Sequence, residues 1–333
     1  MILIFSQAEF EYTTDVIYEW IVHLGGNVRR VNGRTLMESK NFKIDFTSSK
    51  RNLALNDINI DDVNIIWYRR WMGQYSFDKK RDLNAFLKRE FRSLSQYFFS
   101  CFSTDKWYNK DSYQKDYASK SAQLFFASKN GFKIPTTLIT TNKKELVKFI
   151  EENDSVIMKP IGDIDTFHDK IQKKNLAPFT ERIDENIINN LKETFFPTLF
   201  QKEIKKKLEV RVFFDSGDIY SMAIFSASNK ETEIDFRQYD NKLPNRNVPF
   251  NLTDIEEKKI RKFMKDVDLQ TGSLDFIFDL NNELYFLEVN PLGQFGMVSL
   301  PCNYNIEKKI AEKLILIDNE KNKNTTFRKD ETC

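Results

Sequence analysis

Residues 272–290, GSLDFIFDLNNELYFLEVN, constrain the fold most strongly, because two apolar runs flank Asn281 and Asn282. Asparagine tolerates the left-handed backbone of tight turns, so the segment is expected to form an antiparallel hairpin. A two-residue turn at the asparagines pairs Asp275 with Glu288 across the two strands. Like charges directly opposite each other destabilise a sheet, so the fold has to compensate for this pair of carboxylates.

The same register places Ser273 opposite Asn290, on the face that carries the two carboxylates. On the other face, Phe276 is expected to meet Leu287 in an apolar layer. One compensator for the paired charges is Mg²⁺, because carboxylate and amide oxygens are ligands that this ion prefers. The alternative is a solvated sheet edge where both carboxylates face water. The metal interpretation implies that replacing either carboxylate with alanine raises stability when no ion is bound.

Composition excludes several classes of protein. The chain has 333 residues, 41% hydrophobic and 30% charged, enough for a large core divided among two or three lobes. A net charge of +2 demands neither nucleic acid nor an anionic membrane, and no apolar window reaches the length of a membrane span. The histidines are only His23 and His168, and Cys101, Cys302 and Cys333 lie far apart. We therefore expect a cytoplasmic globular protein that acts through carboxylates, lysines, arginines or a cofactor, without a thiolate zinc site.

Strand and helix patterns divide the chain into parts. A long helix is expected over 83–102, where Phe91, Leu94, Phe98 and Phe102 fall on one face. This apolar stripe either packs on its own lobe or forms the seam of a homodimer. The expected parts are an amino-terminal α/β domain (1–105), a central lobe (106–200) with a mobile loop or loose hairpin at 161–182, a carboxy-terminal lobe (201–318) and a flexible tail (319–333).

Two lysines stand where a phosphate could bind. Lys159 ends the strand-like run SVIMKP just before the polar stretch, and Lys120 lies on the helix that ends at Gly131. A lysine at a strand end beside a loop is a plausible phosphate ligand. Each lysine taken singly is equally explained as a solvated surface charge.

Two arginines lie within apolar strand patterns, Arg211 in LEVRVFF and Arg237 in EIDFRQY. A buried guanidinium without a counter-ion is unfavourable, so each is expected to meet an anion. The anion is either a carboxylate two residues away on the same strand, Glu209 or Asp235, or a phosphate or substrate carboxylate.

Five motifs in order resemble the ATP-grasp superfamily over residues 106–318: a lysine-bearing helix ending in NGFKIPTT, then IMKP, FQKEI, GSLDFIFD and FLEVNP. FLEVNPLGQFGMVS, IDFRQYD, NIIWYRRW and CNYNIEKKIA are similar, more narrowly, to ATP-grasp peptide maturases of the grasp-with-spasm type. These maturases are related to the enzymes that make microviridin-like graspetides. The resemblance implies a mixed α/β and α+β ATP-grasp fold, with an amino-terminal α/β lobe and two lobes that clamp ATP.

The resemblance also implies roles for individual residues. Arg237, oriented by Asp235, would receive the acidic side chain of the substrate, and Arg246 is a weaker candidate for the same anionic pocket. The implied ligands of ATP and Mg²⁺ are Lys120 and Lys159 at the phosphates, Gln201, Glu203 and Ile204 along the hinge that reads adenine and ribose, Arg211 at the transferring phosphoryl group, and Asp275, Glu288 and Asn290 around Mg²⁺.

Two departures from the superfamily pattern affect these roles. The stretch after Lys159 has Gly162 as its one glycine, where many members have a glycine-richer loop, and the hinge reads Lys202-Glu203 where Gln-Glu is more usual.

The implied substrate is a ribosomal precursor peptide with a leader segment and a Thr- and Glu-containing core. A Glu or Asp side chain would be activated as an acyl phosphate and joined to a Thr or Ser hydroxyl, or to a Lys amine, giving macrocyclic esters or amides. Residues 161–182 are the place to seek leader docking, although an ATP lid explains them equally well. The alternatives are an ATP-grasp ligase for amino acids or dipeptides, and a non-catalytic binder of peptide or RNA.

Overall fold

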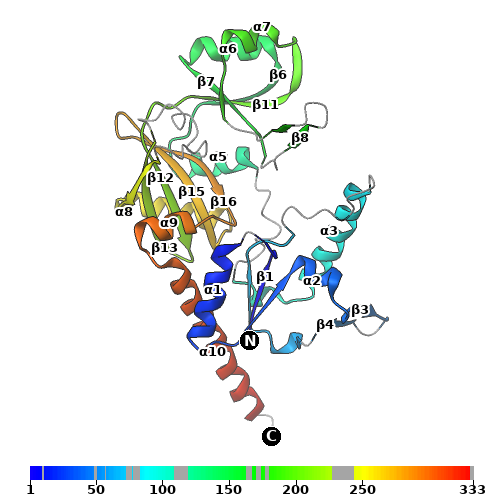
Figure 1. The fold of residues 1–333 in the computed structure, drawn as a ribbon. Coiled ribbons are helices and arrows are strands. Elements are labelled where there is room, and N and C mark those ends of the chain that lie inside the picture. The colour runs from blue at the N-terminus through cyan, green and yellow to red at the C-terminus, as the bar shows by residue number, and fades with distance from the viewer. Residues whose placement is uncertain are drawn as a thin grey trace. The chain divides into compact units, whose positions relative to one another are not determined.

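The computed structural model describes residues 1–9, 11–48, 51–56, 58–72, 77, 83–108, 119–162, 167–169, 174–176, 180–226 and 244–330. The chain forms two compact units, drawn in Figure 1. Unit 1 comprises Met1–Gln114 together with Asn305–Cys333, and unit 2 comprises Lys115–Tyr304. The carboxy-terminal segment thus belongs with the amino-terminal domain, whereas residues of both predicted ATP-grasp lobes share unit 2. The predicted division into lobes at 105, 200 and 318 stays a prediction.

A parallel sheet forms the centre of unit 1. Its strands, in spatial order, are β2 (Val28–Asn32), β1 (Ile2–Ser6) and β5 (Ile65–Tyr68). All of β1 is buried, as expected for the middle strand of a parallel sheet. Helix α1 (Tyr12–His23) crosses from β1 to β2 and packs against α10 (Ile306–Asp330) (Figure 1).

Aromatic rings fill the core of unit 1 between the sheet and α3 (Asn84–Ser100). Phe5 of β1 contacts Phe98, Phe99 and Phe102 with ring centroids 5.3–5.5 Å apart. Phe91 is also buried within the unit. Of the two explanations for the predicted stripe, packing on its own lobe is therefore confirmed, and a homodimer stays a prediction.

The remaining elements of unit 1 are short. They are α2 (Gly33–Glu38), the antiparallel hairpin of β3 (Phe42–Phe46) and β4 (Arg51–Leu55), and the 3₁₀ turns η1 (Ile60–Asp62) and η2 (Thr104–Lys106). The amino group of Met1 pairs with Asp318 at 2.7 Å, which ties α10 to the start of β1.

Helix α10 continues through residues 319–330, which the sequence pattern had assigned to a frayed tail. No Gly or Pro interrupts the sequence between Ile306 and Asp330, so nothing in the backbone ends the helix earlier. None of the described helices is both long enough and apolar enough to cross a bilayer.

The first sheet of unit 2 is antiparallel and four-stranded. Its strands, in spatial order, are β10 (Glu181–Arg182), β7 (Val156–Lys159), β11 (Thr194–Lys202) and β6 (Thr137–Asn142). Helices α6 (Lys143–Glu152) and α7 (Glu185–Asn190) follow β6 and β10 in the chain, and Leu146 and Phe149 of α6 pack on Val156 and Phe200. Within the predicted stretch 161–182, β8 (Phe167–Asp169) and β9 (Lys174–Leu176) pair as a hairpin, which agrees with the loose-hairpin option.

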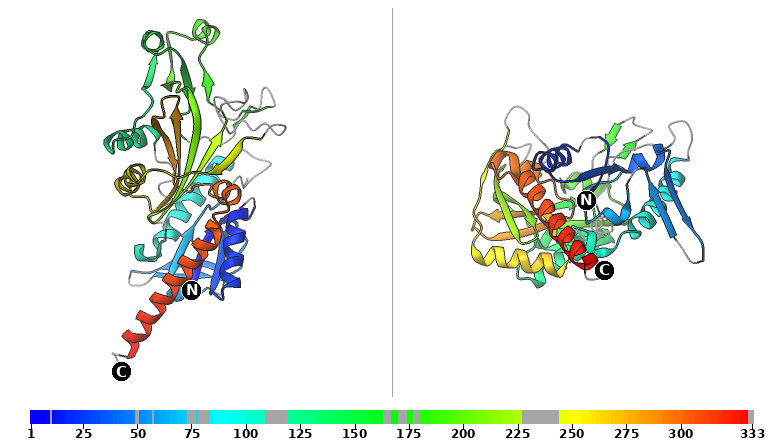
Figure 2. Two further views of the ribbon diagram at one scale, coloured as in Figure 1. Left: turned by 90° about the vertical axis from the view of Figure 1, so that its left-hand side faces the viewer. Right: turned by 90° about the horizontal axis from the view of Figure 1, so that it is seen from below.

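The second sheet of unit 2 is five-stranded and carries the predicted site. Its strands, in spatial order, are β14 (Arg246–Pro249), β13 (Asp218–Phe225), β12 (Lys206–Asp215), β15 (Thr271–Asp279) and β16 (Leu284–Asn290). Helices α5 (Lys120–Lys129) and α8 (Asp254–Asp266) cover one face, whose core includes Leu124, Phe263 and Phe286. The left view of Figure 2 shows these helices on one side of the sheet and α9 (Gly296–Cys302) on the other.

The hairpin of β15 and β16 pairs as predicted at the end far from its turn and differs from the prediction next to the turn. Asp275 lies opposite Glu288 and Ser273 opposite Asn290, but Phe276 faces Phe286 rather than Leu287. The cause is a three-residue turn closed by Asp279 and Glu283, followed by a bulge that restores the register before Asp275. The prediction that Leu287 enters the apolar layer was therefore wrong, and Phe286 occupies that place.

Candidate functional site

A row of charged side chains crosses the face of the second sheet that α5 and α8 leave uncovered. Arg211 of β12 is paired in register with Asp275 of β15, and Asp275 with Glu288 of β16. Their strand neighbours Val210 and Leu274 point into the core on the opposite face. The predicted juxtaposition of Asp275 and Glu288 is thus confirmed.

Protein cations neutralise both carboxylates of this row. Arg211 Nη1 donates to Asp275 Oδ1 at 3.1 Å and to Oδ2 at 3.2 Å. Lys120 Nζ, at the start of α5, lies 2.9 Å from Glu288 Oε2. The like-charge repulsion predicted from the sequence is therefore compensated by an arginine and a lysine within the described residues.

Arg211 does not take the partner on its own strand that the sequence offered. Glu209 accepts instead from Lys206 and from Ser226. A residue directly across a sheet is closer than one two positions along the strand, so Asp275 is the nearer carboxylate. Of the alternatives left open for Arg211, the pairing with Glu209 is therefore not the one that the structure shows.

The charged row is partly buried and has spare donor capacity. The side chains of Arg211 and Asp275 are 7% and 15% exposed, and those of Lys120 and Glu288 are 15% and 29% exposed. Within the described part of the chain, buried Arg211 Nε and Ser273 Oγ have no hydrogen-bond partner. An oxyanion brought to this face would satisfy such donors.

The donor set for Mg²⁺ fits at two of its three predicted positions. Asp275 and Glu288 present oxygen ligands on one face, as Mg²⁺ requires. Asn290 Oδ1 instead accepts from Leu292 N at 3.1 Å and from Gly293 N at 3.0 Å, which shapes the turn after β16. In the ranges that the structure covers, no three His, Cys, Asp or Glu side chains cluster as metal ligands. A ligand role for Asn290 stays a prediction.

The turn after β16 packs tightly against β15. Gly293 has φ +53°, and a Cβ at this position would stand 2.7 Å from Ser273 Oγ and 3.0 Å from Ser273 N. Glycine is therefore required here by both its backbone conformation and the space available.

Sequence reasoning missed Gln123, which positions the lysine of the row. Gln123 is buried on α5, donates from Nε2 to Val289 O at 3.0 Å and accepts from Val289 N at 2.9 Å. Its amide takes the place of a neighbouring strand along the outer edge of β16. Lys120 lies one helical turn earlier on α5, beside Glu288. The available signal was a glutamine between apolar residues in SAQLFF, which the helical pattern alone did not single out.

The predicted hinge residues lie where β11 leaves the first sheet. Gln201 is buried and donates from Nε2 to Thr137 Oγ1 at 3.0 Å. Arg182 binds both oxygens of Glu203, at 2.8 and 2.6 Å, and Ser155 Oγ donates to the same carboxylate at 2.6 Å. The hydrogen bonds from Arg182 lower the pKa of Glu203. The Glu203 side chain is thus engaged in holding β10 and β11 together, and its contact with a nucleotide stays a prediction.

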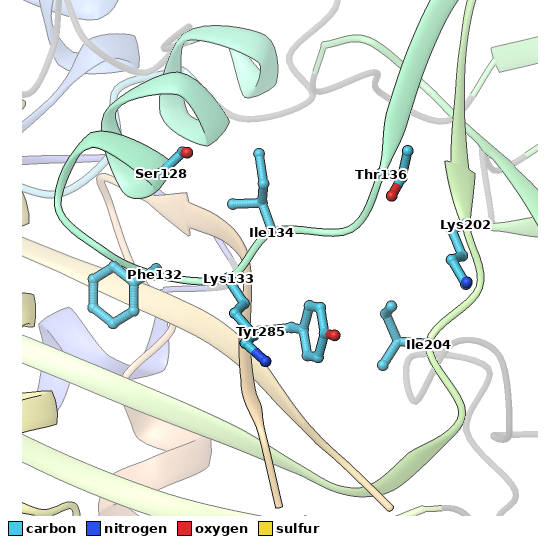
Figure 3. A pocket seen from close by; sticks show the side chains of 8 residues that line it. All are labelled: Ser128, Phe132, Lys133, Ile134, Thr136, Lys202, Ile204 and Tyr285. Carbon is cyan, nitrogen blue, oxygen red and sulfur yellow. The ribbon is translucent and has the colours of Figure 1, made fainter. Parts of the chain in front are cut away.

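A pocket of about 410 Å³ lies between the two linkers that join the sheets of unit 2 (Figure 3). One linker runs from α5 to β6 and the other from β11 to β12, and Figure 3 shows Ile134 of the first across from Ile204 of the second. Among the predicted site residues that the structure describes, Ile204 lines this pocket. The lining residues are Ser128, Phe132, Lys133, Ile134, Thr136, Lys202, Ile204 and Tyr285.

Other predicted residues are placed less completely. Lys159 is the last residue of β7, opposite Leu199 of β11, as predicted for a strand end. Arg246 is exposed on β14, with its guanidinium 5.7 Å from the Phe225 ring centroid. Arg237 and Asp235 lie outside the described residues.

Comparison with known proteins agrees with this geometry. A RiPP-associated ATP-grasp ligase of Chryseobacterium gregarium, solved with ADP and a leader and core peptide, is 25% identical, with a TM-score of 0.80 and 96% of each chain covered. The macrocyclase MdnC of Microcystis aeruginosa, solved with the precursor peptide MdnA, is 23% identical, with a TM-score of 0.78 over 95% of this chain and 99% of that one.

A curated protein is also similar in sequence. An uncharacterized protein of Methanocaldococcus jannaschii is 28% identical over 201 residues, which is 60% of this chain and 45% of that protein. This chain therefore matches less than half the length of that relative.

The predicted resemblance to ATP-grasp enzymes, and to their peptide-modifying members, is confirmed at the level of the fold. The model of the RimK-like ATP-grasp domain matches residues 116–314, which is more than half of the sequence and spans the whole charged row. The chain belongs to the RimK-like ATP-grasp family.

Proposed function

We propose that this protein is an ATP-dependent ligase that crosslinks a ribosomal precursor peptide, joining Glu or Asp side chains to Thr or Ser hydroxyls or to Lys amines. The observation that carries this proposal is the row of Arg211, Asp275, Glu288 and Lys120 on the face of the second sheet opposite α5 and α8. The likeness to a ligase that was solved with ADP and a leader and core peptide, over 96% of the chain, supports a peptide substrate.

Within this proposal the basic residues bind and orient phosphoryl groups. Lys120 and Lys159 would contact the phosphates of ATP, and Arg211 the transferring phosphoryl group through its unpaired Nε donor. The contact of Lys120 with Glu288 holds its ammonium beside the charged row before nucleotide binds. Mg²⁺ held by Asp275 and Glu288, with Asn290 as the third predicted ligand, would neutralise phosphate charge and orient the phosphates.

The proposed reaction has two steps. A substrate carboxylate attacks the γ-phosphorus of ATP, so that a C–O–P bond forms and ADP leaves. The hydroxyl or amine then attacks the acyl carbon, loses its proton, and expels phosphate as the ester or amide forms. The net change in the peptide is the loss of one water per crosslink. Positioning and charge neutralisation carry such chemistry, which suits a chain with two histidines. Arg237 and Asp235 remain our proposed receptors for the acidic side chain of the substrate.

The test is ADP release and peptide mass with Mg-ATP and a Glu- and Thr-rich peptide, sought among the short reading frames beside the gene. Loss of one water per crosslink, matched by one ADP, is the expected result. Turnover with free amino acids alone would indicate a small-molecule ligase instead. No ADP under any condition, together with salt-sensitive retention of RNA, would favour a binding protein.

A matched pair of variants tests the site itself. Glu288 and Glu283 lie near each other along the chain, and each has a lysine at 2.9 Å, Lys120 and Lys133 respectively. Glu288→Gln should abolish crosslinking, whereas Glu283→Gln should leave it near the wild-type rate. Full activity of Glu288→Gln would remove Glu288 from the proposed metal site.

A further inference from the structure

The hairpin of β3 and β4 is a sheet of its own within unit 1. β3 pairs with β4 and with no other strand that the structure describes. Figure 1 shows this hairpin on the side of unit 1 away from α1. A two-stranded hairpin is marginally stable alone, and the outer edge of each strand carries backbone N–H and C=O groups that a further strand could pair.

The two faces of β3 differ in chemistry. Side chains alternate along a strand, so Phe42, Ile44 and Phe46 share one face. Lys43 and Asp45 share the other face. A strand that joins the edge of β3 therefore has to match an apolar face and a charged face at the same time.

The apolar face is attached to α3 at one end and exposed at the other. The Phe42 ring lies 6.1 Å from the ring of buried Phe98. The Phe46 ring also lies 6.1 Å from a ring of α3, that of Tyr97, but Phe46 is 70% exposed and Tyr97 38% exposed. Exposed apolar residues that stand singly need no explanation, whereas two adjoining exposed rings favour contact with a partner.

The charged face carries two opposite charges that solvent reaches. Lys43 Nζ pairs with Asp45 Oδ2, and their side chains are 69% and 37% exposed. Asn52 Nδ2 of β4 donates to Asp45 Oδ1 at 2.7 Å. The hydrogen bonds from Lys43 and Asn52 lower the pKa of Asp45, so its carboxylate is ionised at neutral pH.

A second copy of β3 matches both faces when it runs antiparallel to the first. With the two-fold axis at Ile44, Lys43 of each copy lies opposite the partner subunit's Asp45, and exposed Phe46 lies opposite the partner subunit's Phe42. A shift by one residue would set apolar side chains against charged ones. A shift by two would set Lys43 or Asp45 against the same residue of the partner subunit, and such like charges are destabilising.

We propose that the outer edge of β3 is an interface between two copies of this chain, whose hairpins join into one four-stranded antiparallel sheet. Opposite charges placed evenly about Ile44 favour a second copy over an unrelated strand, because they complement themselves. This seam differs from the apolar stripe of α3, which is buried in the core of unit 1. It belongs to unit 1 and the charged row to unit 2, so the proposal does not depend on the ligase activity.

The test is sedimentation equilibrium of the full chain at low ionic strength. An interface built on a five-residue strand is small, so we expect a dimer that dissociates in the micromolar range. Lys43→Asp places aspartates of the two copies opposite each other, and Asp45→Lys does the same with lysines. Each single reversal should raise the dissociation constant of the dimer about tenfold or more. The difference from the wild type should shrink at high salt, which screens exposed charges.

Restoring the opposite charges should restore the dimer. The double variant Lys43→Asp/Asp45→Lys should dimerise about as tightly as the wild type. An equimolar mixture of the two single variants should form a heterodimer, because the aspartates of one face the lysines of the other. This rescue also shows that the single variants are folded. Glu312→Lys is the matched control, since it makes the same charge change as Asp45→Lys at an exposed position of α10, and it should dimerise as the wild type does.

A wild type that stays monomeric up to sub-millimolar concentration would overturn the proposal. A dimer that both single reversals leave unchanged would overturn this surface as its seam, as would a mixture of the two variants that forms no heterodimer. Reversals that change the binding of a charged peptide, but not the oligomeric state, would assign the edge to a peptide instead of a second copy. Each result leaves the proposed ligase activity to its own test, because ADP release and crosslinking are measured separately.

Discussion

Replacing Asp275 with asparagine tests what neutralises the paired carboxylates. Arg211 is 7% exposed, and Asp275 is its carboxylate partner through two hydrogen bonds to Nη1. Removing one member of a buried pair costs about 3–5 kcal/mol, because the other charge stays buried. Asparagine keeps an oxygen that can accept from Arg211, so we expect Asp275→Asn to lose about 2–3 kcal/mol. Because this loss comes from the pairing with Arg211 and not from a bound metal, EDTA should not change it.

Glu288→Gln should be far milder in the same assay. Lys120 and Glu288 are both more exposed than Arg211, and partly exposed ion pairs contribute about 1 kcal/mol or less. Losing the repulsion between the two carboxylates offsets part of even this small loss. The expected order of stability is therefore wild type, then Glu288→Gln close behind, then Asp275→Asn.

Urea unfolding in EDTA, followed by far-ultraviolet circular dichroism, measures these differences. With a slope of about 2 kcal/mol per molar urea, Asp275→Asn should lower the midpoint by about 1 M. Tryptophan fluorescence provides an internal reference, because all four tryptophans, Trp20, Trp67, Trp71 and Trp107, belong to unit 1.

The double variant Arg211→Gln/Asp275→Asn completes a thermodynamic cycle and should recover much of the loss. A midpoint that rises in Asp275→Asn would refute the reasoning. It would show that the repulsion predicted from the sequence, rather than the pairing with Arg211, dominates the energy of the row.

Two further predictions follow from contacts in unit 2. Gln123→Leu leaves the buried N–H and C=O of Val289 unpaired, so we expect the free energy of unfolding to fall by about 2–4 kcal/mol. Hydrogen exchange at the Val289 amide should become faster, and unchanged exchange would contradict the role of Gln123. Arg182 lowers the pKa of Glu203, so this pair stabilises the fold above the unfolded-state pKa of glutamate and the contribution is lost as pH falls through the lower folded-state value. Arg182→Gln should therefore be less stable than the wild type at pH 7 and approach it at pH 3, whereas a gap independent of pH would refute the role of the ion pair.

In the hairpin of β15 and β16, the pairing far from the turn could be predicted from the sequence, and the pairing next to the turn could not. Alternation within DFIFD and LEVN fixes which side chains share a face over a few residues. The turn length is decided by Asp279, whose Oδ1 accepts from Asn281 N and Glu283 N and so closes a three-residue loop. Without the bulge, Asp275 would lie opposite Leu287. Because Phe286 and Leu287 are both apolar, the sequence offers no signal for which one enters the core.

The partners of the carboxylates were hidden from the sequence for a different reason. Arg211 and Asp275 are separated by 64 positions, and their strands become neighbours only because β15 enters the sheet beside β12. Lys120 comes from α5, which reaches Glu288 because Gln123 attaches that helix to the edge of β16. Short-range patterns identify charges that need a partner, but the topology of the sheet decides which partner each receives.

The charged row of unit 2 contains as many basic as acidic side chains. In unit 2, Asp275 and Glu288 face Arg211 and Lys120, so the row is neutral as a whole. A neutral row accepts a polyphosphate best when a divalent cation enters with it, because either ion alone would unbalance the site. The pairing of two acidic with two basic side chains in unit 2 thus supports the proposal that a nucleotide binds there together with Mg²⁺.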